Sequence, residues 1–398
     1  MKPKEYLITP EDLLFFRDAR PMAAGEGYGY GCNMPKPDQL HKALRTALLH
    51  AKGQLPASKS LANHTSDREK HKKGRRKRIG SDTFGSLRTV GPFPYLPETG
   101  VLFALPRDVI AIDVAEKSLS KTHLEKTDSP RPGAEWRPKA LPLAGRPPTK
   151  QRFSGCWTAS QVKAYLAGRQ TDFTPIPPNT VWEEEWRVGV EIDPATYSSR
   201  EGQLYAAAHM RMTDGAGFAV GVSLHEADDL AALKSIQFGG EQRLARLQPM
   251  QALLPDIPPP TVPDSGPACI VKWILLTPAV FAHGTVPGWC MDSREPAKLP
   301  PGRVCLPVNG RAELAACAVG DPDPFSGWDF LDGQAKPSLY AVRPGAVYYF
   351  WCESPAVAAA LCRKIHWQPR SDMLSEAGYG YGVCTVEPTD MNLNPQGE

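Results

Sequence analysis

Residues 37–48 read PDQLHKALRTAL, and they carry the clearest helix signal in a chain of 398 residues. From Leu40, apolar side chains recur at intervals of four, seven and eight residues, which puts them on one helical face. The pair Pro37-Asp38 is typical of a helix start, and Asp38 is expected to cap it. The opposite side carries basic side chains: His41, Lys42 and Arg45.

Other elements can be placed around this helix by their periodicity. A short strand at 6–9 precedes it. Alternating apolar residues downstream predict half-buried strands, and a short helix and a glycine pair precede the last strand. The expected positions are 187–192, 204–212, 218–224, 226–236 (helix), 239–240 (glycines) and 243–247. Taken in order these make βαββαβ, the ferredoxin-like arrangement.

The same order recurs after a proline-rich segment at 255–267, which reads as a stiff linker. Strands are expected at 269–276, 311–319, 337–351 and 383–386, and Ser354-Pro355 predicts the start of a helix over 356–365. An internal duplication accounts for this repeat. The predicted fold class is therefore α+β, with tandem ferredoxin-like (RRM-like) domains at 1–254 and 268–398.

Between the first helix and residue 180 the periodicity fades. Proline and glycine are abundant, with 41 Pro and 34 Gly in the chain, but 41% hydrophobic residues exclude global disorder. Residues 51–180 are interpreted as an insertion in the first domain. Within it, 59–78 holds nine basic and two acidic residues, while the whole chain has a net charge of only +3. This segment either adds salt-dependent affinity for RNA or is a solvated charge run.

Several classes of site are excluded. The chain has nine Cys without a CxxC pair, which indicates reduced thiols of a cytoplasmic protein. No Cys/His spacing predicts a metal site, and no cofactor is expected. The most apolar stretch, 269–282, is too short to span a bilayer, and the N-terminus shows no signal-peptide pattern.

Two Gly-Tyr-Gly-Tyr-Gly segments occur, at 27–31 and 378–382. Neither has the spacing of a nucleotide-binding glycine motif. They are either turns that need a positive φ, or loops whose backbone N–H groups approach phosphate while tyrosines stack on bases. The tyrosines concerned are Tyr28, Tyr30, Tyr379 and Tyr381.

Residues 12–21 read DLLFFRDARP and place an Arg-Asp-x-Arg cluster directly after the first strand. Arg17 and Asp18 either form structural ion pairs, or Arg17 or Arg20 contacts phosphate through its planar guanidinium group. The segment resembles the "DPLFFRDGRPF" opening of one RAMP-superfamily family, the subunit of type III-B CRISPR (Cmr) effector complexes that binds the crRNA 5′ handle. Leu13, Ala19 and Met22 depart from that pattern.

Further segments are similar to the same family and follow its order. They are PKPDQLHKALRTAL at 35–48, FGGE at 238–241, FSGWD at 325–329, RPGAVYYF at 343–350 and the glycine turn at 378–382. The resemblance implies a non-catalytic subunit that binds the repeat-derived handle, caps the backbone filament of RAMP subunits and docks the large polymerase-type signalling subunit. DNA contact is not expected. The implied RNA-binding residues are Phe16, Arg17, Arg20, Lys36, Lys42, Arg45, Gly239, Gly240, Arg243, Gly378, Tyr379, Gly380, Tyr381 and Gly382.

An enzyme and a pure protein scaffold are the two alternatives. Some relatives in the superfamily cleave precursor crRNA without metal, and His41, beside Lys42 and Arg45, is the best candidate for a general base here. His209 and His366 have no acid or base partner in the sequence and are expected to be structural. A scaffold would not need the basic residues that gather around the first strand and helix.

Overall fold

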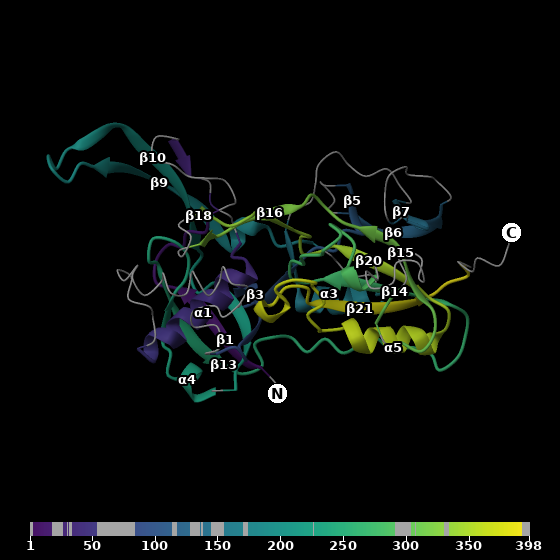
Figure 1. Cartoon of the computed structure of the whole chain (residues 1–398). Helices are drawn as coiled ribbons and strands as arrows, with labels where there is room; N and C mark the ends of the chain where they lie inside the picture. Colours follow the sequence, from purple (N-terminus) through teal and green to yellow (C-terminus); the bar gives the residue numbers. More distant parts are fainter. Residues whose placement is uncertain are drawn as a thin grey trace, which may run out of the picture. The chain divides into compact units, whose positions relative to one another are not determined.

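The computed structural model divides the described residues between two compact units, each assembled from three segments of the chain (Figure 1). The first unit comprises Met1–Glu98, Asn179–Leu254 and Pro324–Leu339, and the second comprises the intervening segments and Tyr340–Glu398. The described residues are 3–17, 27–29, 31, 34–53, 84–113, 118–127, 136, 138–144, 155–169, 174–225, 227–290, 304–306, 308–329 and 334–391. Arg20, Tyr30 and the basic segment 59–78 therefore lie outside the description, as does the Tyr28 side chain.

The first unit is built on antiparallel strands that lie in the order β12-β13-β1-β11-β3. β1 is central, and Tyr6 on it pairs with Val220 of β11 and Pro249 of β13. Apolar side chains of β1 are buried, as the strand prediction at 6–9 requires. The bounds are β1 Lys4–Pro10, β3 Arg88–Leu96, β11 Gly217–Ser223, β12 Ser235–Gln237 and β13 Leu244–Met250.

Helix α1, Pro37–Ala51, buries Leu40, Leu44 and Leu48 and contacts β3 and β12. It confirms the predicted helix, but its N-cap lies two residues before the expected Asp38. Lys36 is the N-cap residue, and its backbone N–H donates to the Gln39 side chain at 2.7 Å. Asp38 instead lies inside the first turn, where a carboxylate interacts favourably with the helix dipole.

Strand β3 corrects the interpretation of residues 51–180 as an insertion. This nine-residue strand pairs with β11 and belongs to the sheet of the first unit, from Arg88 opposite Ser223 to Tyr95 opposite Gly217. The pairing register shifts between Ala219 and Gly221. Pro92 and Pro94 hide this strand in the sequence, because proline lacks the N–H that a strand interior normally donates.

A second sheet in the first unit consists of a long two-stranded ribbon, β9 Trp182–Ile192 with β10 Ser199–Met212, and the short strand β2, Gly27–Gly29 (Figure 1). β2 runs parallel to β10, and β9 runs antiparallel to it. β9 and β10 confirm the strands predicted at 187–192 and 204–212, whereas β2 falls in a segment that was expected to be a turn or loop. The strand at 187–192 was expected to be half-buried, but Val188 is 69% exposed and Ile192 is 50% exposed. One face of the distal ribbon is apolar and exposed, while the other carries charged side chains.

The sheet of the second unit is also antiparallel, in the order β15-β20-β14-β21. Helix α5, Pro355–Ile365, packs on it, and its N-cap Ser354 accepts a hydrogen bond from the Val357 N–H, as Ser354-Pro355 predicted. Between β14 and β15 the described residues contain one 3₁₀ turn and no α-helix. The bounds are β14 Cys269–Leu275, β15 Ala312–Ala318, β20 Val347–Cys352 and β21 Gly382–Pro388.

The remaining elements of the described chain are short. The strands are β4 Gly100–Ala104, β5 Val109–Asp113, β6 Ser118–Lys126, β7 Ala140–Ala144, β8 Cys156–Thr158, β16 Asp323–Phe325, β17 Trp328–Asp329, β18 Gln334–Ala335 and β19 Leu339–Ala341. The helices are α3 Ala159–Leu166 and α4 Ala227–Ala231, with 3₁₀ turns η1 Pro178–Thr180, η2 Gly288–Cys290 and η3 Ser375–Ala377. No helix in the described part of the chain has the length and apolarity needed to cross a membrane.

The two units differ from the predicted division at 1–254 and 268–398 in one main respect. Residues 99–178 cluster with the second unit rather than with the first. Within the second unit, Lys139 forms an ion pair with Glu313 of β15, and the Trp136 indole N–H donates to the Leu314 carbonyl. These contacts tie the 99–178 segment to a strand that lies far away in the sequence.

Candidate nucleic-acid interface

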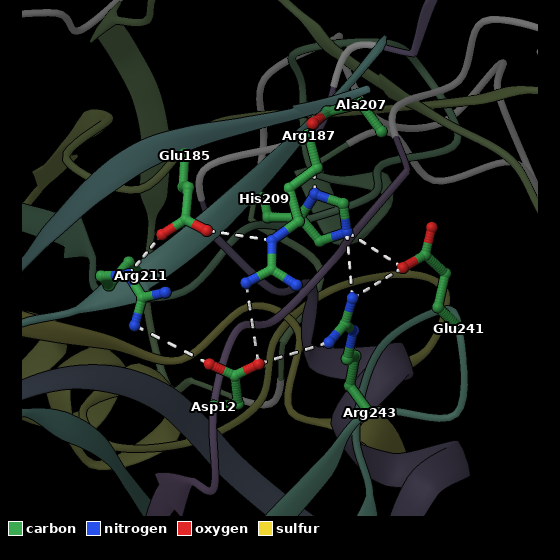
Figure 2. A network of polar contacts seen from close by, with 8 residues as sticks. All are labelled: Asp12, Glu185, Arg187, Ala207, His209, Arg211, Glu241 and Arg243. Atoms are coloured by element: carbon green, nitrogen blue, oxygen red, sulfur yellow. Dashed lines mark hydrogen bonds and ion pairs between the residues drawn. The ribbon is translucent and has the colours of Figure 1, made fainter. Parts of the chain in front are cut away.

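Seven charged or titratable side chains meet in one network of the first unit (Figure 2). They come from β9, from β10, from the chain just after β1 and from the turn between β12 and β13. Three are arginines, three are acids and one is a histidine. The residues are Asp12, Glu185, Arg187, His209, Arg211, Glu241 and Arg243.

The strand register explains why four of these side chains share a face. Side chains two residues apart on a strand point the same way. On the ribbon, His209 pairs with Glu185, and the neighbouring positions two residues along are Arg187 and Arg211. The apolar side chains of the intervening positions therefore occupy the opposite face. This alternation, together with the strand pairing, gives the ribbon a face that carries Glu185, Arg187, His209 and Arg211.

Glu185 accepts hydrogen bonds from two of the arginines. The Nε–H of Arg187 donates to its Oε1 at 2.9 Å, and the Nε–H of Arg211 donates to its Oε2. These hydrogen bonds lower the pKa of Glu185 to about 2. The hydrogen bond to Glu185 in turn raises the pKa of Arg211. The carboxylate is thus charged throughout the physiological range, and it fixes the orientation of both guanidinium groups.

Asp12 lies where the three guanidinium groups converge. Its carboxylate oxygens are 3.5 Å from Arg243 Nη1, 3.7 Å from Arg211 Nη1 and 3.9 Å from Arg187 Nη2. The Asp12 side chain is half exposed. We call these three arginines around Asp12 the arginine tripod. An anion at this position is attracted by all three cations at once.

His209 and Glu241 complete the network on the buried side. His209 is 3% exposed; its Nδ1 lies 3.1 Å from the Ala207 carbonyl oxygen and its Nε2 lies 3.0 Å from Glu241 Oε2. Arg243 Nη2 donates to the same Glu241 oxygen at 2.9 Å. Burial raises the pKa of Glu241, but the hydrogen bonds from His209 and Arg243 outweigh it and lower the pKa. His209 has no acidic neighbour in the sequence, and strand pairing and the turn before β13 supply Glu241 as its partner.

The glycines at 239–240 bring this turn against the chain after β1. Gly239 has φ +99°, and a Cβ there would lie 2.7 Å from the Phe15 carbonyl oxygen. The Gly240 N–H donates to that same oxygen at 2.7 Å. Phe16 is 2% exposed and packs edge-on against Phe238. In this conformation both glycines and Phe16 pack the turn that positions Arg243, and their predicted RNA contacts stay predictions.

The basic residues of α1 that were predicted to bind RNA do not belong to the arginine tripod. Lys42 pairs with Asp38 at 2.6 Å and keeps 59% of its side chain exposed, while Lys36 and Arg45 are half-buried. His41 Nδ1 lies 3.5 Å from the Thr89 hydroxyl. Arg17, just after the buried Phe16, is exposed. The tripod itself is built without α1 side chains (Figure 2).

The glycine turn at 378–382 in the second unit is packed tightly. Tyr379 is fully buried, so its ring is not available to stack on a base in this conformation. The N–H groups of Gly380 and Tyr381 donate to the Pro278 carbonyl and the Thr277 hydroxyl at 2.7 and 2.9 Å. Gly378 and Gly382 are buried as well. Of the tyrosines in this turn only Tyr381 is partly exposed, beside Trp367.

A second polar cluster of this unit surrounds Asp108, which is fully buried. Tyr165 donates to Asp108 Oδ2 at 2.5 Å, and Lys272 Nζ lies 3.6 Å from that oxygen. Burial, followed by the Asp108 charge, raises the pKa of Tyr165. Among the described residues, Asp108 Oδ1, Thr122 Oγ1 and Tyr349 Oη are buried without a hydrogen-bond partner.

Comparison with known families identifies the chain. A family described as CRISPR-associated protein (Cas_Cmr3) matches residues 6–387, nearly the whole length. The chain belongs to the Cmr3 family. The resemblance to the type III-B (Cmr) subunit, drawn from its sequence motifs, is thereby confirmed, and the chain is a Cmr3-type subunit of a type III CRISPR effector complex.

Two solved structures illustrate what this Cmr3-family chain is similar to. A chain of the type III-B Cmr-beta bound to cognate target RNA and AMPPnP has 15% identity and a TM-score of 0.48, covering 94% of this chain and 95% of that one. A chain of the Csm1-Csm4 cassette in complex with AMPPNP has 12% identity and a TM-score of 0.29, covering 86% and 87%. No curated protein matched the sequence.

Sequence reasoning found Arg243 of this Cmr3-family chain but missed Asp12, Arg187 and Arg211 as members of a site. The available signal was the alternation of polar or charged residues with apolar residues in 185–188 and 209–212. Only the pairing of the two strands brings those charges together. Within the described residues, no group of three His, Cys, Asp or Glu side chains is arranged to hold a metal ion.

Proposed function

We propose that this Cmr3-family chain is a non-catalytic RNA-binding subunit that recognises the repeat-derived 5′ handle of crRNA. In the same proposal it caps the backbone filament of RAMP subunits and docks the large polymerase-type subunit in the cytoplasm. Its family membership supports a place in a type III effector complex. The handle, the cap and the docking role are inferred from the family resemblance.

The observation that carries RNA binding is the arginine tripod. Three half-exposed or partly exposed guanidinium groups converge on one point, which is the arrangement that binds phosphate groups of nucleic acids. The Arg-bearing turn is held against the DLLFFRDARP segment by the hydrogen bond from the Gly240 N–H to the Phe15 carbonyl, so two of the sequence motifs meet at this surface. Lys42 and Arg17 add exposed positive charge to the same unit.

We also propose that the two antiparallel sheets are tandem ferredoxin-like domains. In the first unit the strands of a βαββαβ series lie in the order β13-β1-β11-β3, and in the second the order β21-β14-β20-β15 is equivalent. Helices α1 and α5 support the comparison by following a strand and packing on its sheet. The second unit departs from it between β14 and β15, where the described residues form no α-helix.

Co-purification tests the proposal directly. A tagged full-length chain is expressed with its complex, and the RNA that travels with it is sequenced while mass spectrometry identifies the proteins. We expect RNA whose 5′ ends are repeat-derived, together with the large and backbone subunits. Recovery of the complex with RNA that lacks a repeat-derived 5′ end would contradict handle recognition.

A charge reversal on α1 tests one residue of the interface. Arg45→Glu is expected to reduce crRNA retention several-fold, because phosphate contacts dominate affinity for nucleic acids. Lys52→Glu is the matched control, since Lys52 ends the same helix but pairs with Asp229 at 2.6 Å. Equal retention by both variants removes Arg45 from the interface.

The absence of catalysis is tested with repeat RNA in the presence of EDTA. We expect no cleavage products. Metal-independent cleavage that disappears in His41→Ala would replace the proposal by an endoribonuclease with His41 as its general base. The geometry gives His41 one neighbouring hydroxyl, that of Thr89, at 3.5 Å.

A further inference from the structure

The arginine tripod holds an internal anion at the place where an RNA phosphate would bind. We propose that Arg187, Arg211 and Arg243 form a phosphodiester-binding site, and that the Asp12 carboxylate occupies it until RNA displaces it. This inference rests on the proposed function, because it requires that RNA reaches this face. It names a binding site and a regulatory residue that the family match does not assign.

The distances between the Asp12 carboxylate and the three arginines are those of a carboxylate that another anion can replace. Its three arginine contacts, at 3.5 to 3.9 Å, are within range for ion pairing but too long for well-formed hydrogen bonds. Half of the Asp12 side chain is exposed to solvent. Asp12 therefore supplies charge to the tripod without being locked by short contacts. A ligand with more acceptor oxygens can make the hydrogen bonds that Asp12 leaves unmade.

The arginines themselves are held by other carboxylates. Glu185 accepts from the Nε–H groups of Arg187 and Arg211, and Glu241 accepts from Arg243 Nη2 at 2.9 Å. In each guanidinium, the nitrogen nearest Asp12 is a different one from the nitrogen that makes these contacts. Figure 2 shows the dashed contacts from all three arginines ending on the Asp12 carboxylate. The tripod is thus preorganised, which lowers the entropy lost when an anion binds.

The charge balance favours an incoming anion. Three arginines face three carboxylates, so these six charges sum to zero. If Asp12 turns away to solvent, two carboxylates remain against three guanidinium groups. One phosphodiester charge restores neutrality.

The neighbouring part of the charged face points to a nucleotide rather than to an isolated anion. Tyr205 pairs with Gly189 across the ribbon, two residues from Arg187 on β9. A Cβ at Gly189 would lie 2.4 Å from Tyr205 Cζ, so the tyrosine ring lies directly against the glycine backbone. A half-buried aromatic ring beside an arginine offers one base a stacking surface and one phosphate a cation.

Displacement of Asp12 makes it a tethered competitor of RNA. A ligand that merely matches the charge of Asp12 gains little binding free energy, because it must first separate the ion pairs that Asp12 makes. A phosphate that forms hydrogen bonds with all three guanidinium groups gains more binding free energy. Apparent affinity is then reduced by the fraction of molecules in which Asp12 occupies the tripod. Removing the Asp12 charge should therefore strengthen RNA binding, which is the opposite of what a structural ion pair predicts.

The test compares two single variants of the full-length chain that lose the same charge. Asp12→Asn removes the internal anion, while Glu11→Gln removes the adjacent carboxylate, which pairs with Arg246 at 2.7 and 2.9 Å instead. Binding of a repeat-derived RNA oligonucleotide is measured by fluorescence anisotropy at low salt. We expect Asp12→Asn to bind about fivefold more tightly than the wild type, the scale of one exposed ion pair. Glu11→Gln should change binding less than twofold.

Arg211→Gln separates this inference from the proposed function. If Arg211→Gln weakens RNA binding but Asp12→Asn binds no more tightly than Glu11→Gln, the tripod contacts RNA and the displacement inference is overturned. If Arg211→Gln leaves RNA binding unchanged, RNA does not use this face, and both the inference and the tripod argument for RNA binding fail.

Inorganic phosphate provides a second measurement that does not depend on RNA. Phosphate should raise the melting temperature of Asp12→Asn more than that of the wild type, because the vacated tripod binds it. An equal rise in both proteins would overturn the proposal. Asp12→Ser serves the same comparison if Asp12→Asn does not fold.

Discussion

Two carboxylates of the chain, Asp12 and Asp108, each lie beside several cationic or hydrogen-donating side chains, yet they differ in almost every physical respect. Asp12 is half exposed and has three arginines at 3.5 to 3.9 Å. Asp108 is fully buried, accepts a 2.5 Å hydrogen bond from Tyr165 and has Lys272 at 3.6 Å. The first belongs to the first unit and the second to the second unit.

The difference teaches how burial decides what a charge cluster can do. A buried carboxylate has lost its water and depends on its protein partners, so removing it leaves those partners unpaired in a medium of low dielectric constant. An exposed carboxylate can exchange its partners for water or for another anion at little cost. Asp108 therefore contributes to the stability of the folded state, while the tripod can exchange Asp12 for another anion.

The largest expected effect is that of Asp108→Ala. It removes the acceptor for Tyr165 and one partner of Lys272, whose side chain is 7% exposed. Breaking a buried pair of this kind costs about 4 kcal/mol of unfolding free energy. Urea unfolding followed by circular dichroism measures it. Tyr165→Phe, which removes only the hydroxyl, should cost less; a loss below about 1 kcal/mol for Asp108→Ala would end the contrast with Asp12.

The next effect concerns the packed glycine turn. Gly380 has φ +80°, and a Cβ there would lie 2.2 Å from the Ser371 amide nitrogen. Gly380→Ala should therefore cost about 3 kcal/mol, through both backbone strain and a steric clash. Gly284→Ala is the matched control, because Gly284 has φ +71° but open space around the added Cβ, and it should cost about 1 kcal/mol. Equal losses of stability would show that packing does not explain the turn.

A smaller effect depends on pH. His366 Nε2–H donates to the Ile257 carbonyl at 2.8 Å, and Nδ1 accepts from the Cys384 N–H at 3.1 Å. Burial lowers the pKa of His366, although the Ile257 hydrogen bond acts in the opposite direction. The unfolded chain takes up this proton near pH 6.5, before the folded chain does, so stability is complete above that pH and falls below it. One proton contributes at most about 1.4 kcal/mol per pH unit.

Melting temperatures measured from pH 8 to pH 5 check this pH dependence. His366→Gln retains hydrogen-bonding capacity but does not titrate, so its curve should be flatter than that of the wild type below pH 6.5. Parallel curves would assign the pH dependence to other groups.

The smallest expected effect on stability is that of Asp12→Asn. Its ion pairs are long and half exposed, and pairs of that kind contribute about 0 to 1 kcal/mol. Urea unfolding should place this variant within about 1 kcal/mol of the wild type, even though its affinity for RNA rises. A loss as large as that of Asp108→Ala would show that the two carboxylates play the same structural part.

Local sequence signals predicted the regular elements well. The apolar spacing after Pro37 and the Ser354-Pro355 pair located α1 and α5 to within two residues at their N-termini. Both depend on short-range physics, because a helix start and an apolar stripe are written within four or five consecutive residues. Strand β3 was hidden, since its prolines remove the local strand signal and its pairing partner lies more than 100 residues away.

Burial and the site were less predictable because they depend on long-range pairing. The alternation in 187–192 correctly predicted a strand with two faces, but nothing in those residues shows whether the apolar face is covered, and Val188 is in fact 69% exposed. Arg243 was found through the neighbouring FGGE motif. Arg187 and Arg211 join it only through the register of β9 with β10, which a single sequence does not specify.

The interleaving of the two units has a consequence for how the chain is made. During synthesis, residues 99–178 leave the ribosome well before Pro255–Asp323 and Tyr340–Glu398, the other segments of their unit. Until those segments have been synthesised, the strands of 99–178 have unpaired edges, and unpaired strand edges favour aggregation. A cut in the proline-rich stretch at 255–267 would likewise yield two fragments that each lack part of a unit. The position that looks most like a domain boundary in the sequence is therefore a poor place to divide the chain for expression.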